Sequence, residues 1–171
     1  NDENDMQWED EFGKGDNYPA YRISYKEVET FIGKLNEYTG LRFSLPTEAQ
    51  WEYAAKGGKN TYYELYAGGG NVLEVAWIDS NSDKCSEVGK KNANGLGLYD
   101  MSGNVWEMCN NWYYDYKDVC DTITSGEDYT GYKVFRGGSW NTNAQQARVT
   151  ARYKQGIHYR DYNTGFRLVI E

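Results

Sequence analysis

Apolar residues recur at helical spacing in two stretches of the first third of the chain. In the first stretch they are Val28, Phe31, Ile32 and Leu35. Steps of three and four residues place side chains on one face of a helix. Ser24 and Glu27 form a capping box before them, because each side chain can bond the other's backbone N–H. The pattern predicts a helix that begins after Ser24 and ends at Gly40.

The second helical stretch has Thr47 as its predicted N-cap, with Gln50 three residues on as the partner of a second capping box. Trp51, Ala54 and Ala55 form its apolar stripe, and the two glycines at 57 and 58 end it. After these glycines helical periodicity disappears.

The chain from residue 62 to residue 171 is typical of short strands between irregular loops. The strand candidates, rich in β-branched and aromatic residues, are 72–77, 133–136 and 165–170. Two helices followed by strands and long loops predict an α+β fold. No internal repeat, low-complexity segment or linker divides the chain, so residues 1–171 are expected to form one domain.

Composition narrows the range of functions. The chain has 171 residues and 39% hydrophobic residues, but no run of about 18 apolar residues that would span a membrane. Lysine and arginine number 18 against 26 aspartates and glutamates, and the net charge of -8 argues against a nucleic-acid partner. Aromatic residues make up 16% of the chain, which argues against disorder. These values indicate a folded domain with a proper core.

Few residues suit familiar catalytic or metal-binding motifs. The single histidine, His158, lies in a polar and aromatic run that predicts a surface loop, and it argues against a His-rich metal site or a Ser-His-Asp triad. The three glycines at 68–70 lack the lysine of a phosphate loop, and no Cys-x-x-Cys motif occurs. Of Cys85, Cys109 and Cys120, at least one stays unpaired within the chain, and a Cys109–Cys120 disulfide is compatible with export.

Two carboxylates lie seven residues apart in the segment 94–107. Asp100 and Glu107 bracket a Gly- and Asn-containing stretch whose carbonyl groups lie between them. Hard oxygen ligands from a short irregular loop are what Ca²⁺ prefers. Solvated turn carboxylates are the alternative, and spacing alone leaves both interpretations open.

Four blocks occur in a fixed order along the chain: LPTEAQWEYAA at 45–55, GLYDMSGNVWE at 97–107, RGGSW at 136–140 and NTGFR at 163–167. Together they resemble the formylglycine-generating enzyme (sulfatase-modifying factor) family over nearly the whole chain from Tyr18. The resemblance implies the family's variant of the C-type lectin-like fold. It also implies that the family's amino-terminal strands would precede residue 1.

The resemblance also implies a calcium site and the loss of a copper site. Carried over to this chain, the calcium ligands are Asp100 and Glu107 with the backbone carbonyls of Gly103 and Val105. Active members bind copper through two cysteines, whose positions here are Thr142 and Ala147. Neither side chain offers the soft sulfur that copper(I) requires. We therefore expect structural calcium, no copper and a protein that is not an enzyme.

The family's substrate pocket is retained in part. Ser139, Trp106 and Asn163 match the pocket, whereas its histidine and tyrosine are replaced by Asn143 and Gln146. The family's iron-dependent sulfoxide synthases carry a separate histidine-rich domain, which a chain with one histidine does not supply.

The chain is also similar to the variable proteins of diversity-generating retroelements, which display a carboxy-terminal ligand-binding surface on the same scaffold. Randomisation at adenines there turns asparagine codons into codons for Tyr, Asp, His and Ser. The corresponding segment, 140–163, is rich in such residues, although ordinary non-catalytic relatives are a sufficient alternative. Tyr and Asn combine rigid contact area with adaptable hydrogen bonding. The predicted ligand-binding residues are Trp140, Asn141, Asn143, Gln145, Tyr153, His158, Tyr159, Asp161, Tyr162 and Asn163.

Three functions follow, in order of preference. The first is an exported or cell-surface, monomeric binding domain that presents residues 140–163 to a protein or glycan ligand. The second is a formylglycine-generating oxidase that acts on a sulfatase cysteine. The third is a structural accessory domain of a surface complex. For the first function, Tyr159 and Tyr162 are expected to be exposed to solvent and to lie in loops, as is Tyr153.

Overall fold

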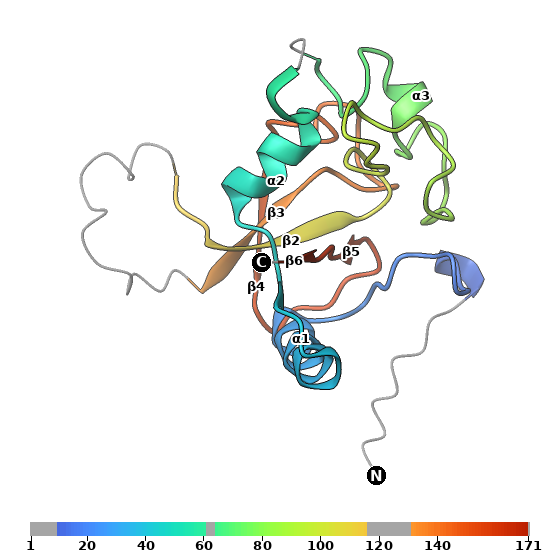
Figure 1. The fold of residues 1–171 in the computed structure, drawn as a ribbon. Coiled ribbons are helices and arrows are strands. Elements are labelled where there is room, and N and C mark those ends of the chain that lie inside the picture. The colour runs from blue at the N-terminus through green and yellow to red at the C-terminus, as the bar shows by residue number, and fades with distance from the viewer. Residues whose placement is uncertain (1–9, 61–63, 116–130, 171) are drawn as a thin grey trace.

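The computed structural model describes residues 10–60, 64–115 and 131–170 and has an α+β fold, as predicted. The first half holds η1 (Asp10–Phe12), α1 (Tyr25–Thr39), β1 (Phe43–Ser44), α2 (Glu48–Ala55), η2 (Gly58–Asn60) and α3 (Val72–Val75). The second half holds β2 (Trp106–Trp112), β3 (Tyr132–Arg136), β4 (Arg152–Gly156), β5 (Thr164–Gly165) and β6 (Val169–Ile170). Figure 1 shows their arrangement.

Both predicted helices form, and their capping boxes are complete. The Ser24 hydroxyl accepts the N–H of Glu27 at 3.3 Å, and the Glu27 carboxylate accepts the N–H of Ser24 at 2.9 Å. Thr47 and Gln50 make the equivalent pair of bonds before α2. Each helix therefore begins where local hydrogen bonding satisfies its first N–H groups.

The central sheet has the strand order β4-β3-β2-β5, with β5 parallel to β2 and the other pairs antiparallel. Side chains of successive strand residues point to opposite faces. On one face Phe135 belongs to the core cluster that includes Val28 of α1. On the other face Val134 belongs to the cluster that includes Trp51 of α2. The two helices therefore cover opposite faces of the sheet, as Figure 1 shows.

Of the three predicted strands, one forms as expected, one is a helix and one is divided into two short strands. The segment 133–136 is a strand, as predicted, within β3. The prediction of a strand at 72–77 is wrong: Val72–Val75 is helix α3, which Asn71 caps by accepting the N–H of Leu73 at 3.2 Å. The predicted strand at 165–170 is two short strands, β5 and β6, which pair with different partners. Apolar β-branched composition alone does not decide between strand and helix in such short runs.

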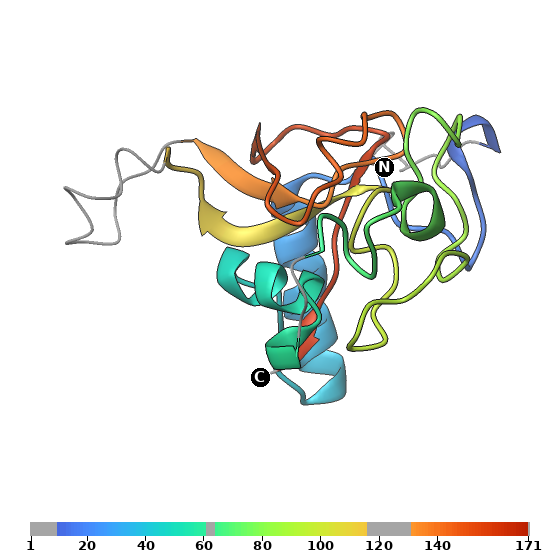
Figure 2. The same cartoon turned by 90° about the horizontal axis from the view of Figure 1, so that it is seen from above.

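The described residues between α2 and β2 form loops apart from η2 and α3, and they lie to one side of the sheet (Figure 2). Close backbone packing holds these loops. Gly103, at φ 74°, is so near Trp77 that a Cβ on it would lie 2.2 Å from the Trp77 carbonyl oxygen. Only glycine fits there. This packing fixes the position of the loop that carries Asp100 and leads into β2, where Glu107 lies.

No helix in the three described ranges is long and apolar enough to cross a membrane.

Candidate functional site

The turn at residues 139–147 is held by side-chain hydrogen bonds of neutral polar residues. Asn141 Oδ1 accepts from the Ser139 hydroxyl and from the Asn163 amide, both at 2.8 Å. Asn143 Oδ1 accepts the N–H of Gln145 at 3.0 Å. These bonds shape the backbone of the turn. They leave the side chains of Asn141, Asn143 and Gln145 exposed.

Beneath this turn the two predicted copper-ligand positions are buried. The Thr142 hydroxyl accepts the N–H of Ser139 at 2.8 Å and donates to the Ser139 carbonyl at 2.9 Å. Ala147 is fully buried, and its Cα would lie 2.8 Å from a Cβ placed on Gly138. Both positions therefore serve the packing of the Gly-Gly turn.

The two cysteines in the described ranges are buried free thiols elsewhere in the fold. Cys85 donates to the Phe12 carbonyl at 2.7 Å, and burial raises the pKa of its thiol to about 11. Cys109 lies in the core beside Val134, and burial raises the pKa of its thiol as well. The possible partner of Cys109, Cys120, lies outside the described residues. High pKa values make both thiols poor nucleophiles and poor metal ligands.

The tyrosines of the predicted binding segment fall into two classes. Tyr159 is 57% exposed, and His158 is exposed in a turn. Tyr153 is 40% exposed but lies in strand β4, so the prediction of a loop is wrong there. It stacks on Trp106 at 5.2 Å between ring centroids. Burial raises the pKa of Tyr153, and the charge of Asp161 adds to the rise.

Tyr162 and Trp140 are half-buried, and the prediction that Tyr162 is exposed to solvent is wrong. The Tyr162 ring stacks on Phe12 at 4.0 Å, and the Arg22 guanidinium lies 5.1 Å from its centroid. The Trp140 indole N–H donates to the Tyr162 carbonyl at 3.4 Å. These rings anchor the segment 140–163 to the amino-terminal part of the chain.

Asp161 and Asn163 hold the backbone after Tyr159. The Asp161 carbonyl accepts the N–H of Arg22 at 2.8 Å, and its carboxylate accepts the N–H of Tyr162 at 2.7 Å. Asn163 gives its amide to Asn141, while its Oδ1 is buried without a hydrogen-bond partner in the described part of the chain. Both residues are half-buried, so they fix the backbone of the site and offer little side-chain surface to a ligand.

The predicted calcium loop brings two carboxylates to a shared cavity of about 380 Å³. Asp100 is buried at φ 57°, and one carboxylate oxygen accepts the N–H of Gly89 at 2.8 Å. Its other oxygen is buried with no hydrogen-bond partner within the described ranges. Burial raises the pKa of Asp100 against the effect of the Gly89 bond, and the charge of Glu107 adds to the rise. A buried carboxylate oxygen without a hydrogen-bond partner is chemically suited to accept a hydrogen bond from water or to bind a cation.

Glu107, the second carboxylate, already has protein partners. Arg167 donates to both of its oxygens, at 2.6 and 2.5 Å, and the Trp51 indole N–H donates to one at 2.6 Å. Arg167 lies in the fourth block of the family resemblance, but its place in the sequence does not mark it as the partner of a glutamate 60 residues earlier. No group of three or more His, Cys, Asp or Glu side chains in the described ranges is placed to hold a metal ion. A cation here would need the carbonyls of Gly103 and Val105.

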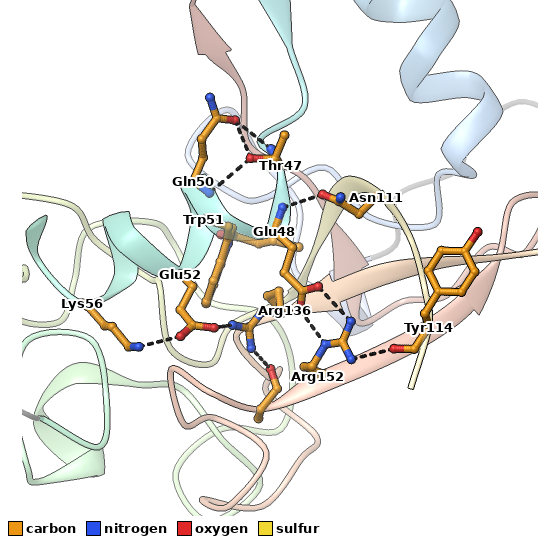
Figure 3. A network of polar contacts seen from close by, with 12 residues as sticks. Thr47, Glu48, Gln50, Trp51, Glu52, Lys56, Asn111, Tyr114, Arg136 and Arg152 are labelled. Atoms are coloured by element: carbon orange, nitrogen blue, oxygen red, sulfur yellow. Dashed lines mark hydrogen bonds and ion pairs between the residues drawn. The ribbon is translucent and has the colours of Figure 1, made fainter. Parts of the chain in front are cut away.

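A network of ion pairs joins α2 to the sheet on the face away from α1 (Figure 3). Arg152 of β4 donates to both oxygens of Glu48, at 2.6 and 2.8 Å. The fully buried Arg136 of β3 pairs with Glu52 and donates to the Ala151 carbonyl at 2.5 Å. The network positions the start of β4 and thereby the turn before it.

The family of the chain is identified over its full length. The whole chain, residues 1–171, matches the sulfatase-modifying factor enzyme 1-like domain. The chain belongs to this family.

Relatives of this sulfatase-modifying factor enzyme 1-like domain carry different names. A chaperone protein LppX of Paenibacillus barcinonensis is 31% identical over 74% of the chain and 49% of its own length. A formylglycine-generating enzyme of Streptomyces coelicolor is 31% identical over 88% of the chain and 52% of its own length. The chain thus spans about half the length of these two curated relatives.

Solved structures support the same assignment. Treponema denticola variable protein 1 superposes with a TM-score of 0.76 at 28% identity, over 91% of this chain and 72% of that one. PvdO from Pseudomonas aeruginosa superposes with a TM-score of 0.79 at 24% identity, over 94% of this chain and 64% of that one, and indicates the fold alone. The predicted C-type lectin-like fold of the sulfatase-modifying factor type is confirmed.

Proposed function

We propose that this family member is a non-catalytic binding domain that presents the carboxy-terminal turn and strand to a protein or glycan ligand. One observation carries the proposal. At the two copper-ligand positions the chain has a threonine hydroxyl bonded to Ser139 and a fully buried alanine. The polar side chains around them, among them Asn143 and Gln145, point outward. The scaffold is kept, the thiolates are absent from these positions, and the surface above them is free for contact.

The presented surface is smaller than the sequence suggests. Its exposed members are Asn141, Asn143, Gln145, Tyr153, His158 and Tyr159. Trp140, Asp161, Tyr162 and Asn163 support them from half-buried positions. An exposed ring and amides on a rigid scaffold are the composition of an antibody paratope. Similarity to a protein named variable protein 1 supports a surface diversified by a retroelement.

We further propose that a structural calcium ion binds Asp100, Glu107 and the carbonyls of Gly103 and Val105. The unpartnered buried oxygen of Asp100 supports this, and the two carboxylates against one guanidinium leave a negative charge for the ion to balance. Glu107 would share its oxygens between the ion and Arg167. The ion would stabilise the loop and take no part in chemistry. An exported or cell-surface location and a monomeric state complete the proposal.

The test of the binding function screens the 171-residue chain against a glycan array and against extracellular protein fractions. A triple variant, Asn143→Ala with Gln145→Ala and Tyr159→Ala, is screened beside it, because all three side chains are exposed. A ligand that the chain captures and the variant loses, at an unchanged melting temperature, supports the proposal. Capture that the triple variant retains in full would move the binding surface elsewhere.

The oxidase alternative has support in the formylglycine-generating enzyme relative of Streptomyces coelicolor. Incubation with copper(I), O₂ and a Cys-x-Pro-x-Arg peptide, followed by mass analysis for formylglycine, decides it. We expect no turnover above a blank that contains copper alone, because neither Thr142 nor Ala147 supplies a thiolate. Clear turnover would make the protein an enzyme.

A further inference from the structure

The chain from Gly131 to Arg160 is basic, although the whole protein is acidic. None of the 26 acidic residues falls in it. Its basic residues are Lys133, Arg136, Arg148, Arg152, Lys154 and Arg160. The three arginines 136, 152 and 160 pair with glutamates of α1 or α2, and Lys133 is buried. Arg148 and Lys154 are exposed and have no ion pair with a carboxylate in the described part of the chain.

Lys154 lies at the middle of an open sheet edge. Among the described strands, β4 pairs with β3 and with no other strand. The Tyr132 carbonyl accepts the N–H of Tyr113, the residue after β2, at 2.9 Å. The N–H and C=O of the next residue of β3, Lys133, therefore point the other way, toward its partner Gln155 in β4. By the alternation of an antiparallel ladder, the N–H and C=O of Lys154 face away from β3. A further strand can bond to them.

We propose that an acidic, extended segment of a protein partner adds to the sheet as a strand beside β4. The proposal rests on the binding function above and names its ligand class. An added strand gains affinity from main-chain hydrogen bonds and specificity from alternate side chains. A glutamate or aspartate opposite Lys154 would meet a free ammonium group.

Both faces of this edge offer aromatic contacts to the added strand. The Lys154 ammonium lies 5.1 Å from the Tyr113 ring and 5.4 Å from the Tyr132 ring. Tyr153 points to the opposite face, where it is 40% exposed and packs on Trp106 and Phe135. Apolar residues of the partner strand would extend these clusters.

The same lysine disfavours a second copy of the chain at this edge. An antiparallel pair of β4 strands centred on residue 154 would place two ammonium groups side by side, which is destabilising. A lysine on an edge strand is a common safeguard against such self-pairing. Lys154 therefore selects an acidic partner strand over a basic one.

The experiment uses three capped peptides of about eight residues. One alternates Glu and Val, the second alternates Lys and Val, and the third is the Glu–Val peptide methylated on every backbone amide nitrogen, so that neither edge can donate hydrogen bonds. Each is added at about 1 mM to the 171-residue chain, and amide hydrogen exchange is followed by NMR. We expect the first peptide alone to slow exchange at Lys154, by about threefold or more. Unchanged exchange at Lys154 with the Glu–Val peptide overturns the proposal.

Two charge-reversal variants sharpen the result. Lys154→Glu should weaken the Glu–Val peptide by about three- to tenfold and favour the Lys–Val peptide. Lys34→Glu makes the same charge change on an exposed position of α1 and should alter affinity by less than about twofold. Equal effects of the two variants would reduce the interaction to net charge and contradict an added strand.

The outcome separates this proposal from the binding function on which it rests. If Tyr159→Ala abolishes capture of a ligand found in the screen while Lys154 exchange never changes, the display surface stands and the added strand falls. If the Glu–Val peptide protects Lys154 in a chain that captures nothing in the screen, the edge stands and the display surface falls.

Discussion

The α2 side of the sheet and the carboxy-terminal surface are built from opposite kinds of contact. Beneath α2, the fully buried Arg136 and the half-buried Arg152 are bound by the glutamates of one helix. Around the turn at 139–147, neutral amides and hydroxyls bond one another, and Tyr159 extends into solvent. Breaking a buried ion pair is costly, whereas exposed neutral side chains are replaced cheaply. The buried ion pairs and the exposed neutral side chains therefore lie in adjacent but separate layers.

Among the substitutions that test this contrast, Arg136→Met should have the largest effect on the free energy of unfolding. It removes the ion pair with Glu52 and the bond to the Ala151 carbonyl, so we expect a loss of about 3 kcal/mol in the free energy of unfolding. Urea denaturation measures it. Arg148→Met, an exposed control on the carboxy-terminal surface, should change the free energy of unfolding by less than about 0.5 kcal/mol. Similar losses in both variants would mean that the two layers share one network.

Glu107 of β2 joins α2 to the end of the chain, because it accepts hydrogen bonds from both Trp51 of α2 and Arg167. Calcium at a hundredfold excess over its dissociation constant would stabilise the fold by about 2.7 kcal/mol. EGTA should therefore lower the melting temperature by about 5–10 °C. Asp100→Asn is the matched variant, and its melting curve should respond little to EGTA. A wild-type curve that EGTA leaves unchanged would contradict the calcium site.

Single substitutions at two tyrosines distinguish the anchoring side chains of the carboxy-terminal surface from the exposed ones. Tyr162→Ala removes the stack on Phe12 and should cost about 2 kcal/mol of unfolding free energy. Tyr159→Ala should cost less than about 0.5 kcal/mol, because that ring is 57% exposed. Thermal melts of the pair measure the difference. The double variant is unsuitable for binding assays, since its unfolding would hide the role of Tyr159. If Tyr159→Ala is the more destabilising change, the assignment of scaffold and display side chains is reversed.

The smallest expected effect concerns Glu27, which joins α1 to Arg160 of the carboxy-terminal segment. Burial raises the pKa of this carboxyl, but bonds from Ser24 and the Arg160 guanidinium outweigh it and hold the pKa below its ordinary value. A depressed folded-state pKa contributes stability that is present above the unfolded pKa and disappears as pH falls through the folded one. Glu27→Gln should thus cost less than about 1 kcal/mol at neutral pH, and nothing well below pH 4. Urea titrations from acid to neutral pH measure it. A difference from wild type that stays constant with pH would indicate lost packing instead of lost charge.

Short-range chemistry explains the features that the sequence predicted correctly. The capping boxes at Ser24 and Thr47 lie within four residues of their partners, and both helices begin where these boxes place them. The four ordered blocks were sufficient for the family and its fold. The exposed state of His158 also followed from its polar neighbours.

The site could be predicted only in part, because its side chains are sorted by contacts between distant segments. Tyr159 and Tyr162 look alike in sequence, and contacts with distant residues, above all with Phe12 some 150 residues away in the chain, make Tyr162 the anchor. Glu107 was predicted as a metal ligand, and the fold adds Arg167 as its charge partner. Neither contact leaves a periodic signal that sequence patterns can detect.

The sequence by itself determined the two long helices, the family and the absence of thiols at Thr142 and Ala147. The tertiary structure decided that Val72–Val75 is a helix and that Arg152–Gly156 is the edge strand of the sheet among the described residues. It also decided that the backbone N–H and C=O of Lys154 face away from β3. The physical reason is the range of the forces involved. Caps and apolar periodicity act within one or two turns of the chain. A strand and its open edge exist only once segments distant in the sequence have paired.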